Sequence, residues 1–124
     1  MSGVLYPCFR ISATALSIAS ASFSILKPYL SIIAADKIVA IGEIGLDYYY
    51  DDGAPRELQR KIFIEQIDVA KQMNKPIVVH NRDAHGDVMD ILKKEAKGLT
   101  GVMHCYSGSW EMAKELIKMN FFLF

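Results

Sequence analysis

Short apolar runs alternate with longer amphipathic stretches from about residue 36 onward. The apolar runs are "KIVAIGE" (37–43), "PIVVH" (76–80), "LTGVMH" (99–104) and "FFLF" (121–124). Because the runs are continuously apolar rather than alternating, they are typical of strands buried on both faces, as in a parallel sheet. The pattern therefore predicts four parallel strands.

The stretches between the runs repeat apolar residues at three- and four-residue steps, the period of a helix that packs one face on a sheet. The first helix is expected from Pro55, a favourable first helical position. Asp83 and Ser109 are the expected N-terminal caps of the second and third. The order β-α-β-α-β-α-β requires parallel crossovers, which leaves an open doubly wound sheet or part of a (β/α)8 barrel.

Each of the first three apolar runs ends in a residue able to bind a metal ion: Glu43, His80 and His104. In a parallel sheet the strand ends lie at one edge, where active sites form. Two imidazoles and one carboxylate are a familiar ligand set for zinc or a similar divalent ion. The alternative is three separate loop residues, because a lone histidine at a strand end is more often simply hydrogen-bonded.

Two further groups are candidates for binding substrate. Arg82 follows His80 closely and could reach a phosphate, or it belongs to an ordinary charged turn. The run "YSGS" (106–109), which contains Ser107, offers backbone N–H groups to an anion at a helix start. Such a short run is also common in turns, so both interpretations stay open.

The remaining candidate site residues each have a functional and a structural interpretation. The run "YYY" (48–50) could stack on nucleobases or wall the mouth of the sheet. Asp47 could orient a ligand or bond the turn. Cys105 stands beside His104, but neighbouring strand residues point to opposite faces, so a nucleophile–base pair is disfavoured and a packing role is expected.

Composition limits the function classes without choosing one. The chain has 124 residues, 52% of them hydrophobic, with 14 basic and 14 acidic residues. A net charge of zero argues against a surface that grips nucleic acid through its phosphates alone, although a nuclease with bound metal ions is compatible with it. Cys8 and Cys105 suggest no disulfide scaffold, so a reducing cytoplasm is expected.

The first 35 residues differ from the rest of the chain. They are rich in serine, and Arg10 and Lys27 are their only charged residues. The uncharged stretch between these two is too short and too polar to span a membrane, and serines interrupt it where a signal peptide is apolar. We therefore predict a divergent leader of uncertain structure over residues 1–35, no membrane segment, and one domain over residues 36–124.

Four blocks of sequence carry a resemblance to a known family. They are "AIGEIGLDYYY", the helical pattern Gln59, Phe63, Gln66 and Ala70, "KPIVVHNRDA" and "GVMHCYSGS". Together they resemble the TatD-related deoxyribonucleases over about residues 36–124. The resemblance implies a metal-dependent hydrolase with a TIM-type (β/α)8 barrel, which cuts phosphodiester bonds in DNA with two divalent ions. It implies Glu43 between the metals, and His80 and His104 as imidazole ligands.

The chain also departs from the pattern of that family. The family has a His-x-His pair on its first strand and a late Thr-Asp pair, and this chain has neither. A full barrel takes about 250 residues. We therefore expect an incomplete barrel of about three βα units plus the start of a fourth strand. The resemblance implies two divalent ions in the family, and we expect this chain to bind at most one Mg²⁺, Mn²⁺ or Zn²⁺.

These departures leave three functions open. The first is a deoxyribonuclease impaired by truncation, with DNA as its substrate. The second is a non-catalytic barrel fragment that associates with itself through open sheet edges. The third is a metal-dependent hydrolase that acts on the amide or ester bonds of small substrates.

Overall fold

The computed structural model describes residues 38–124, so the leader predicted for residues 1–35 lies outside the described residues. In chain order the elements are β1 (Ile41–Asp47), α2 (Arg56–Gln72), β2 (Ile77–Arg82), α3 (His85–Glu95), β3 (Gly101–Met103), α4 (Trp110–Lys118) and β4 (Phe121–Leu123). The predicted order of four strands and three helices is confirmed. Within the described residues, no helix is long and apolar enough to cross a membrane.

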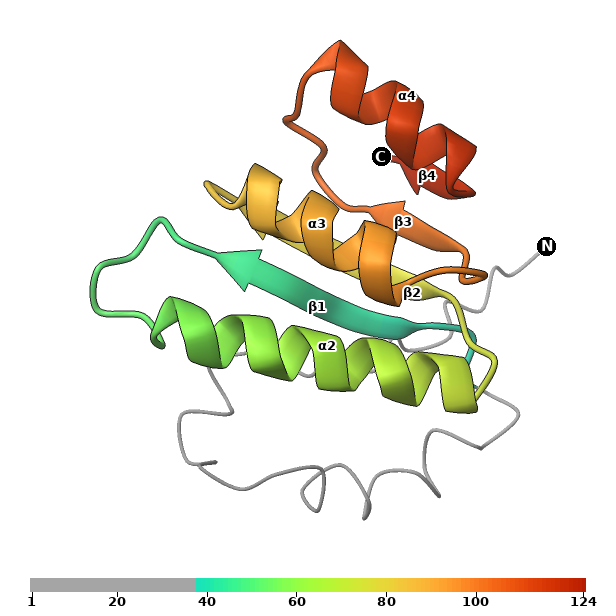
Figure 1. Ribbon diagram of the computed structural model, residues 1–124, viewed down its shortest axis with the longest axis horizontal. Helices are drawn as coiled ribbons and strands as arrows, with labels where there is room; N and C mark the ends of the chain where they lie inside the picture. The colour runs from blue at the N-terminus through green and yellow to red at the C-terminus, as the bar shows by residue number, and fades with distance from the viewer. Residues whose placement is uncertain (1–37) are drawn as a thin grey trace, which may run out of the picture.

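The four strands form one parallel sheet in the order β1-β2-β3-β4. Figure 1 shows the helices α2, α3 and α4 packed along one side of this sheet. Each strand is the neighbour of the next one in sequence, and the order never reverses. That succession is typical of a (β/α) barrel, whereas a doubly wound sheet has a point where the strand order switches.

The hydrophobic core lies between the sheet and its helices. Ile44, Val79 and Met103 point from three successive strands into this core and are almost fully buried. From α2, Phe63 and Ile67 fill the same layer, as the predicted helical stripe requires. Burial on this side of the sheet removes apolar surface from water and holds the strands in register.

The opposite side of the sheet, which we call the inner face, carries the alternate side chains. Glu43, Val78 and His80 lie on it and are only half-buried. The continuous apolar runs predicted burial on both faces, and in the described residues only the helix-covered face is fully buried. The reason is the two-residue alternation of a strand, which sends every second side chain to the inner face.

Two strand boundaries differ from the prediction. β1 continues to Asp47, four residues beyond the expected end at Glu43, and β2 continues two residues beyond His80. Gly45 makes the extension of β1 possible. Its φ is +138°, and a Cβ at this position would collide with the main-chain carbonyl oxygen of His80 in the paired strand. Only glycine accepts this conformation and this close approach.

The helix starts also test the sequence predictions. Ser109 caps α4 as expected, because its Oγ accepts a hydrogen bond from the main-chain N–H of Met112 at 3.2 Å. Asp83 was expected to cap α3, and this is wrong: Ala84 occupies the cap position, and Asp83 has a φ of +55° in the turn before it. Pro55 is the residue before α2 rather than its first helical residue.

Candidate metal centre

Three successive strands bring Glu43, His80 and His104 together on the inner face. Glu43 is the third residue of β1, His80 is the fourth of β2, and His104 directly follows β3. The parallel register pairs Gly45 with His80 and Val79 with Met103, so the three side chains lie side by side across the sheet. Their convergence was predicted although they are far apart in sequence.

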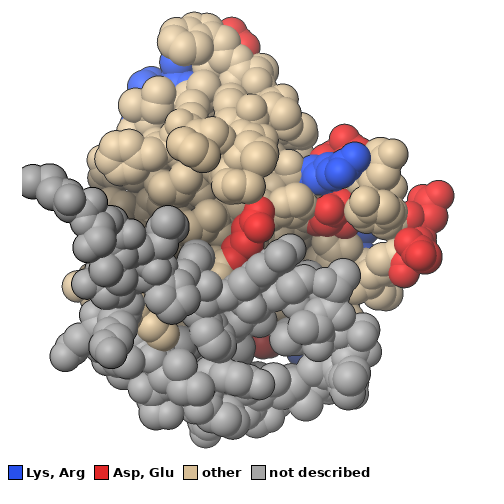
Figure 2. All heavy atoms as spheres, turned by 180° about the vertical axis from the view of Figure 1, so that it is seen from behind, with Lys and Arg blue, Asp and Glu red and all other residues tan. Residues whose placement is uncertain are grey.

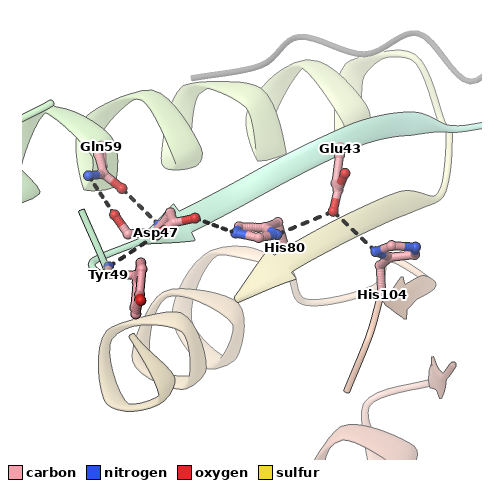
Figure 3. Close-up of polar contacts among 6 residues, drawn as sticks. All are labelled: Glu43, Asp47, Tyr49, Gln59, His80 and His104. Carbon is pink, nitrogen blue, oxygen red and sulfur yellow. Dashed lines mark hydrogen bonds and ion pairs between the residues drawn. The ribbon is translucent and has the colours of Figure 1, made fainter. Parts of the chain in front are cut away.

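The carboxylate of Glu43 lies between the two imidazoles. Its Oε1 atom is 3.3 Å from Nδ1 of His80 and 3.3 Å from Nδ1 of His104. Figure 3 shows the three side chains in a row, with the carboxylate in the middle. Each side chain is partly exposed, so the row can be reached from solvent.

Asp47 extends the row at its other end. Its Oδ2 atom lies 3.0 Å from Nε2 of His80, on the side of the ring opposite Glu43. Because an ionised carboxylate only accepts hydrogen bonds, Nε2 must carry the proton in this contact. The Nδ1 atom that faces Glu43 then holds either a lone pair or a second proton. Sequence reasoning left Asp47 open between orienting a ligand and bonding the turn. The turn interpretation is confirmed, because its Oδ1 accepts the main-chain N–H of Tyr49 at 3.0 Å, and the contact with His80 leaves the role of orienting a ligand as a prediction.

Gln59 fixes the end of β1 from the helix side. Its Oε1 accepts the main-chain N–H of Asp47 at 2.9 Å, and its Nε2 donates to the carbonyl oxygens of Asp47 at 2.9 Å and Ala54 at 2.8 Å. The side chain is 6% exposed. Sequence reasoning noted Gln59 only as part of the family pattern. A polar residue inside the buried stripe of α2 is the signal that could have pointed to this role.

The two predicted substrate-binding residues are not among the side chains that contact Glu43 in the row. Arg82, the last residue of β2, has its guanidinium 3.8 Å from the ring centroid of Tyr49. Ser107 is exposed in the turn between β3 and α4, beyond His104. The cap of α4 is Ser109, so Met112 N–H at that helix start is already bonded by a side chain.

Cys105 differs from its predicted packing role. It is exposed, and its Sγ lies 3.7 Å from Nε2 of His104. The prediction assumed that both residues belong to a strand, where neighbours point to opposite faces. β3 ends at Met103 instead, and a φ of +50° at Cys105 turns the chain so that the two side chains meet.

Tyr48 belongs to the wall of the sheet. Its hydroxyl donates a 2.6 Å hydrogen bond to Oδ2 of Asp87 in α3, and the guanidinium of Arg56 lies 4.4 Å from its ring centroid. Desolvation, followed by the bond to Asp87, raises the pKa of Tyr48 to about 12. The tyrosine run was expected either to stack on nucleobases or to wall the mouth of the sheet, and the contacts of Tyr48 fit the second interpretation. Its hydroxyl stays protonated at neutral pH.

Charge on the side opposite the helices is sparse. Figure 2 shows that most of the described surface there is uncharged, with acidic residues mainly toward one margin, others near the centre and the top, and few basic residues. No broad basic surface is visible in this view. The described surface in this view therefore offers few basic side chains to a polyanion.

As the side chains stand, no group of three or more His, Cys, Asp and Glu residues within residues 38–124 could hold a metal ion. Glu43 lies between the imidazoles, and the three do not surround a common point. The contacts of Glu43 nevertheless place one carboxylate oxygen beside two imidazole nitrogens. The predicted role of these residues as ligands therefore remains a prediction.

The fold and the row of acidic and imidazole side chains define a class: a (β/α)-barrel type protein with a polar cluster where neighbouring parallel strands meet. The family model described as TatD related DNase matches residues 14–123. The chain belongs to this family. The match begins at residue 14, inside the leader predicted for residues 1–35. The boundary between leader and domain at residue 35 therefore stays a prediction.

Individual relatives agree with the family. The chain is 53% identical over 91 residues to the uncharacterized metal-dependent hydrolase YabD of Bacillus subtilis (strain 168), which covers 73% of this chain and 35% of the relative. It is 37% identical over 90 residues to the human 3′-5′ RNA nuclease TATDN2, covering 72% of this chain and 12% of the relative. The chain thus spans about a third of the bacterial relative.

A solved structure shows the same architecture. The structure of YJJV, a TatD homolog from Escherichia coli K12, matches with a TM-score of 0.80 and 32% sequence identity. The match covers 95% of this chain and 45% of that one. The predicted fold, a parallel βα repeat that forms part of a TIM-type barrel, is confirmed.

Proposed function

We propose that this chain carries part of the metal centre of a hydrolase that cleaves phosphodiester bonds in DNA. Glu43, His80 and His104 are the proposed ligands of at most one divalent ion. The observation that carries the proposal is the position of Glu43 Oε1, 3.3 Å from Nδ1 of both histidines. Membership of a family described as DNases, and a human relative named as an RNA nuclease, support a nucleic acid as the substrate.

The spacing of the donor atoms fits a shared cation. Two ligand atoms bound to one tetrahedral ion at about 2.0–2.1 Å lie roughly 3.3 Å apart. A direct charge-assisted hydrogen bond between nitrogen and a carboxylate is shorter, about 2.7–2.9 Å. The two distances from Glu43 therefore match atoms that share an ion better than atoms that share a proton.

The charge of the cluster also fits a divalent cation. With neutral imidazoles, the carboxylates of Glu43 and Asp47 give it two negative charges within the row of contacts. If Nε2 of His80 donates to Asp47, neutral Nδ1 turns a lone pair toward the carboxylate of Glu43, which is unfavourable without a cation between them. A ligating histidine whose other nitrogen is held by a carboxylate is the usual arrangement around protein-bound metals.

The chain's own residues have distinct parts in this chemistry. Asp47 holds the ring of His80 and keeps Nδ1 directed at the centre. Glu43 supplies the negative charge that retains the ion, and Arg82 and Ser107 are proposed contacts to phosphate. When bound, a divalent ion supplies Lewis acidity, which stabilises the charge that develops on the phosphate oxygens. One carboxylate and two imidazoles suit zinc or manganese by ligand softness, and Mg²⁺ stays open.

Cleavage of labelled single-stranded DNA tests the proposal. The full chain is incubated with Mg²⁺, Mn²⁺ or Zn²⁺, and products are resolved on a denaturing gel, with RNA of the same sequence and a simple aryl ester in parallel. We expect ion-dependent DNA cleavage that Glu43→Gln reduces at least about 100-fold, as loss of a transition-state charge contact does. Glu65→Gln, a half-exposed carboxylate on α2, is the matched control. Cleavage of the ester alone, or cleavage indifferent to Glu43→Gln, contradicts the proposal.

A second proposal concerns association between copies of the chain. Phe122 and Phe124, at the β4 edge of the sheet, are 70% and 84% exposed in the described part of the chain. An exposed edge strand with apolar side chains is a template for pairing with another chain. Light scattering at increasing concentration tests this, and Phe122→Lys is expected to restore the monomer. We also propose a cytoplasmic location, because Cys105 is a free thiol.

A further inference from the structure

Arg82, Tyr49 and Tyr50 form a small exposed surface at one end of the row, which we call the aromatic platform. The guanidinium of Arg82 lies 3.8 Å from the ring centroid of Tyr49 and 5.8 Å from that of Tyr50. The two rings meet edge to face at 5.0 Å between centroids. Both tyrosines are more than half exposed, at 54% and 58%. Large aromatic rings held in place and open to solvent are typical of binding surfaces.

The aromatic platform is joined to the candidate metal centre through one carboxylate. Oδ1 of Asp47 accepts the main-chain N–H of Tyr49 at 3.0 Å, and Oδ2 of the same residue contacts Nε2 of His80 at 3.0 Å. Figure 3 shows Tyr49 beside Asp47, at the end of the row that leads through His80 to Glu43. A ligand on the platform therefore lies next to the centre, in a position that the same side chain fixes.

The charges around the platform indicate what it can hold. Among residues 38–124, no carboxylate pairs with Arg82 within 4.0 Å, whereas Arg60 and Lys93 are each paired with one. The face of its guanidinium is stacked on Tyr49, which leaves the N–H groups at its edge available to an anion. The exposed Asp51 and Asp52 in the adjoining turn disfavour a long run of phosphates here.

From this arrangement we propose that the aromatic platform stacks one nucleobase of a single-stranded nucleic acid beside the metal centre. The proposal rests on the proposed function and names the part of the substrate that the chain holds. Aromatic rings and guanidinium planes are the surfaces on which proteins stack unpaired bases. A paired base would have its faces covered by its neighbours, so the platform selects a single strand or a frayed end.

The experiment compares two probes of equal length: oligothymidylate and an abasic deoxyribose-phosphate oligomer. Binding to the full chain is measured by fluorescence anisotropy in EDTA, so that neither cleavage nor the metal centre contributes. We expect oligothymidylate to bind about 10-fold or more tightly than the abasic probe, in line with measured effects of base stacking. Tyr49→Ala/Tyr50→Ala is expected to remove this preference for the probe that carries bases, and Tyr49→Phe/Tyr50→Phe is expected to retain it.

Trp110→Ala is the matched control. Trp110 is an exposed aromatic residue, 68% exposed, with the Lys114 ammonium 5.8 Å from its ring centroid on α4. Its removal is expected to leave the preference for bases intact. The proposal is overturned if the parent binds both probes equally or binds neither, or if the Tyr49/Tyr50 double alanine variant keeps the preference. A failed metal centre would leave these results unchanged and would be detected by the cleavage assay instead.

Discussion

His80 and His104 make the same contact with Glu43, yet their surroundings differ. His80 lies within β2, and its second ring nitrogen is held by Asp47, which is itself fixed by Gln59. His104 follows the three-residue β3, and its second nitrogen faces the thiol of Cys105 at 3.7 Å. The first imidazole is thus held by a chain of hydrogen bonds, whereas the second nitrogen of the other imidazole has only the longer contact with a thiol. If the proposed metal centre forms on this sheet, its β1–β2 side is the part that hydrogen bonds hold in place beforehand.

Removing both imidazoles has the largest expected effect. An ion that binds only the folded chain stabilises it by mass action, by about 2.7 kcal/mol at 100 times its Kd. We expect Mg²⁺, Mn²⁺ or Zn²⁺ to raise the Tm of the parent and to leave that of His80→Ala/His104→Ala unchanged. His85→Ala, at the start of α3, is the control that should respond like the parent. A cooperative transition in the parent that none of the ions moves would show that the row holds no metal.

Substituting the residue that contacts the second ring nitrogen of each histidine tests whether His80 and His104 contribute differently to ion binding. Asp47→Asn is expected to weaken ion binding about 10–100-fold, the usual cost of losing the group that orients a ligating histidine. Cys105→Ser should change it less than about 3-fold, because the thiol is a weak partner at 3.7 Å. Titrating the Tm against ion concentration gives both values. Equal losses in the two variants would mean that the two imidazoles are held alike.

Substitution of Gln59 is expected to have a smaller effect, which is on the free energy of unfolding. Gln59→Met leaves the main-chain N–H and carbonyl of Asp47 without their partner, which should cost about 1–3 kcal/mol of unfolding free energy. Gln66 is the matched control, because it is also buried in α2 but its Nε2 has no hydrogen-bond partner among residues 38–124. Gln66→Met should therefore be nearly neutral or stabilising. Urea unfolding measures the free energy of unfolding of both variants. Similar losses in the two would contradict a specific stabilising role for the hydrogen bonds of Gln59.

The sequence predicted the parts of the molecule that depend on local pattern. Within residues 38–124, the apolar runs located the four strands, and the three-and-four spacing located the three helices. The residues that meet on the inner face, Glu43, His80 and His104, followed from the rule that parallel strands share an edge. These successes need only periodicity and topology.

The errors arose where one residue changes the path of the chain. Gly45 extends β1 past Glu43, and the positive φ of Cys105 brings its thiol to His104. The clamp made by Gln59 on Asp47 joins positions 12 residues apart through side-chain to main-chain bonds. No periodicity records such contacts, because they depend on the relative placement of a helix and a strand.

One consequence follows from Gly45. The missing side chain lets β1 and β2 approach so closely that Glu43 and Asp47 reach the two nitrogens of one imidazole, from either side of that glycine. Any larger residue would force the strands apart and separate both carboxylates from His80 at once. In mutational terms, the least tolerant position of the candidate centre is therefore one that contributes no chemical group at all.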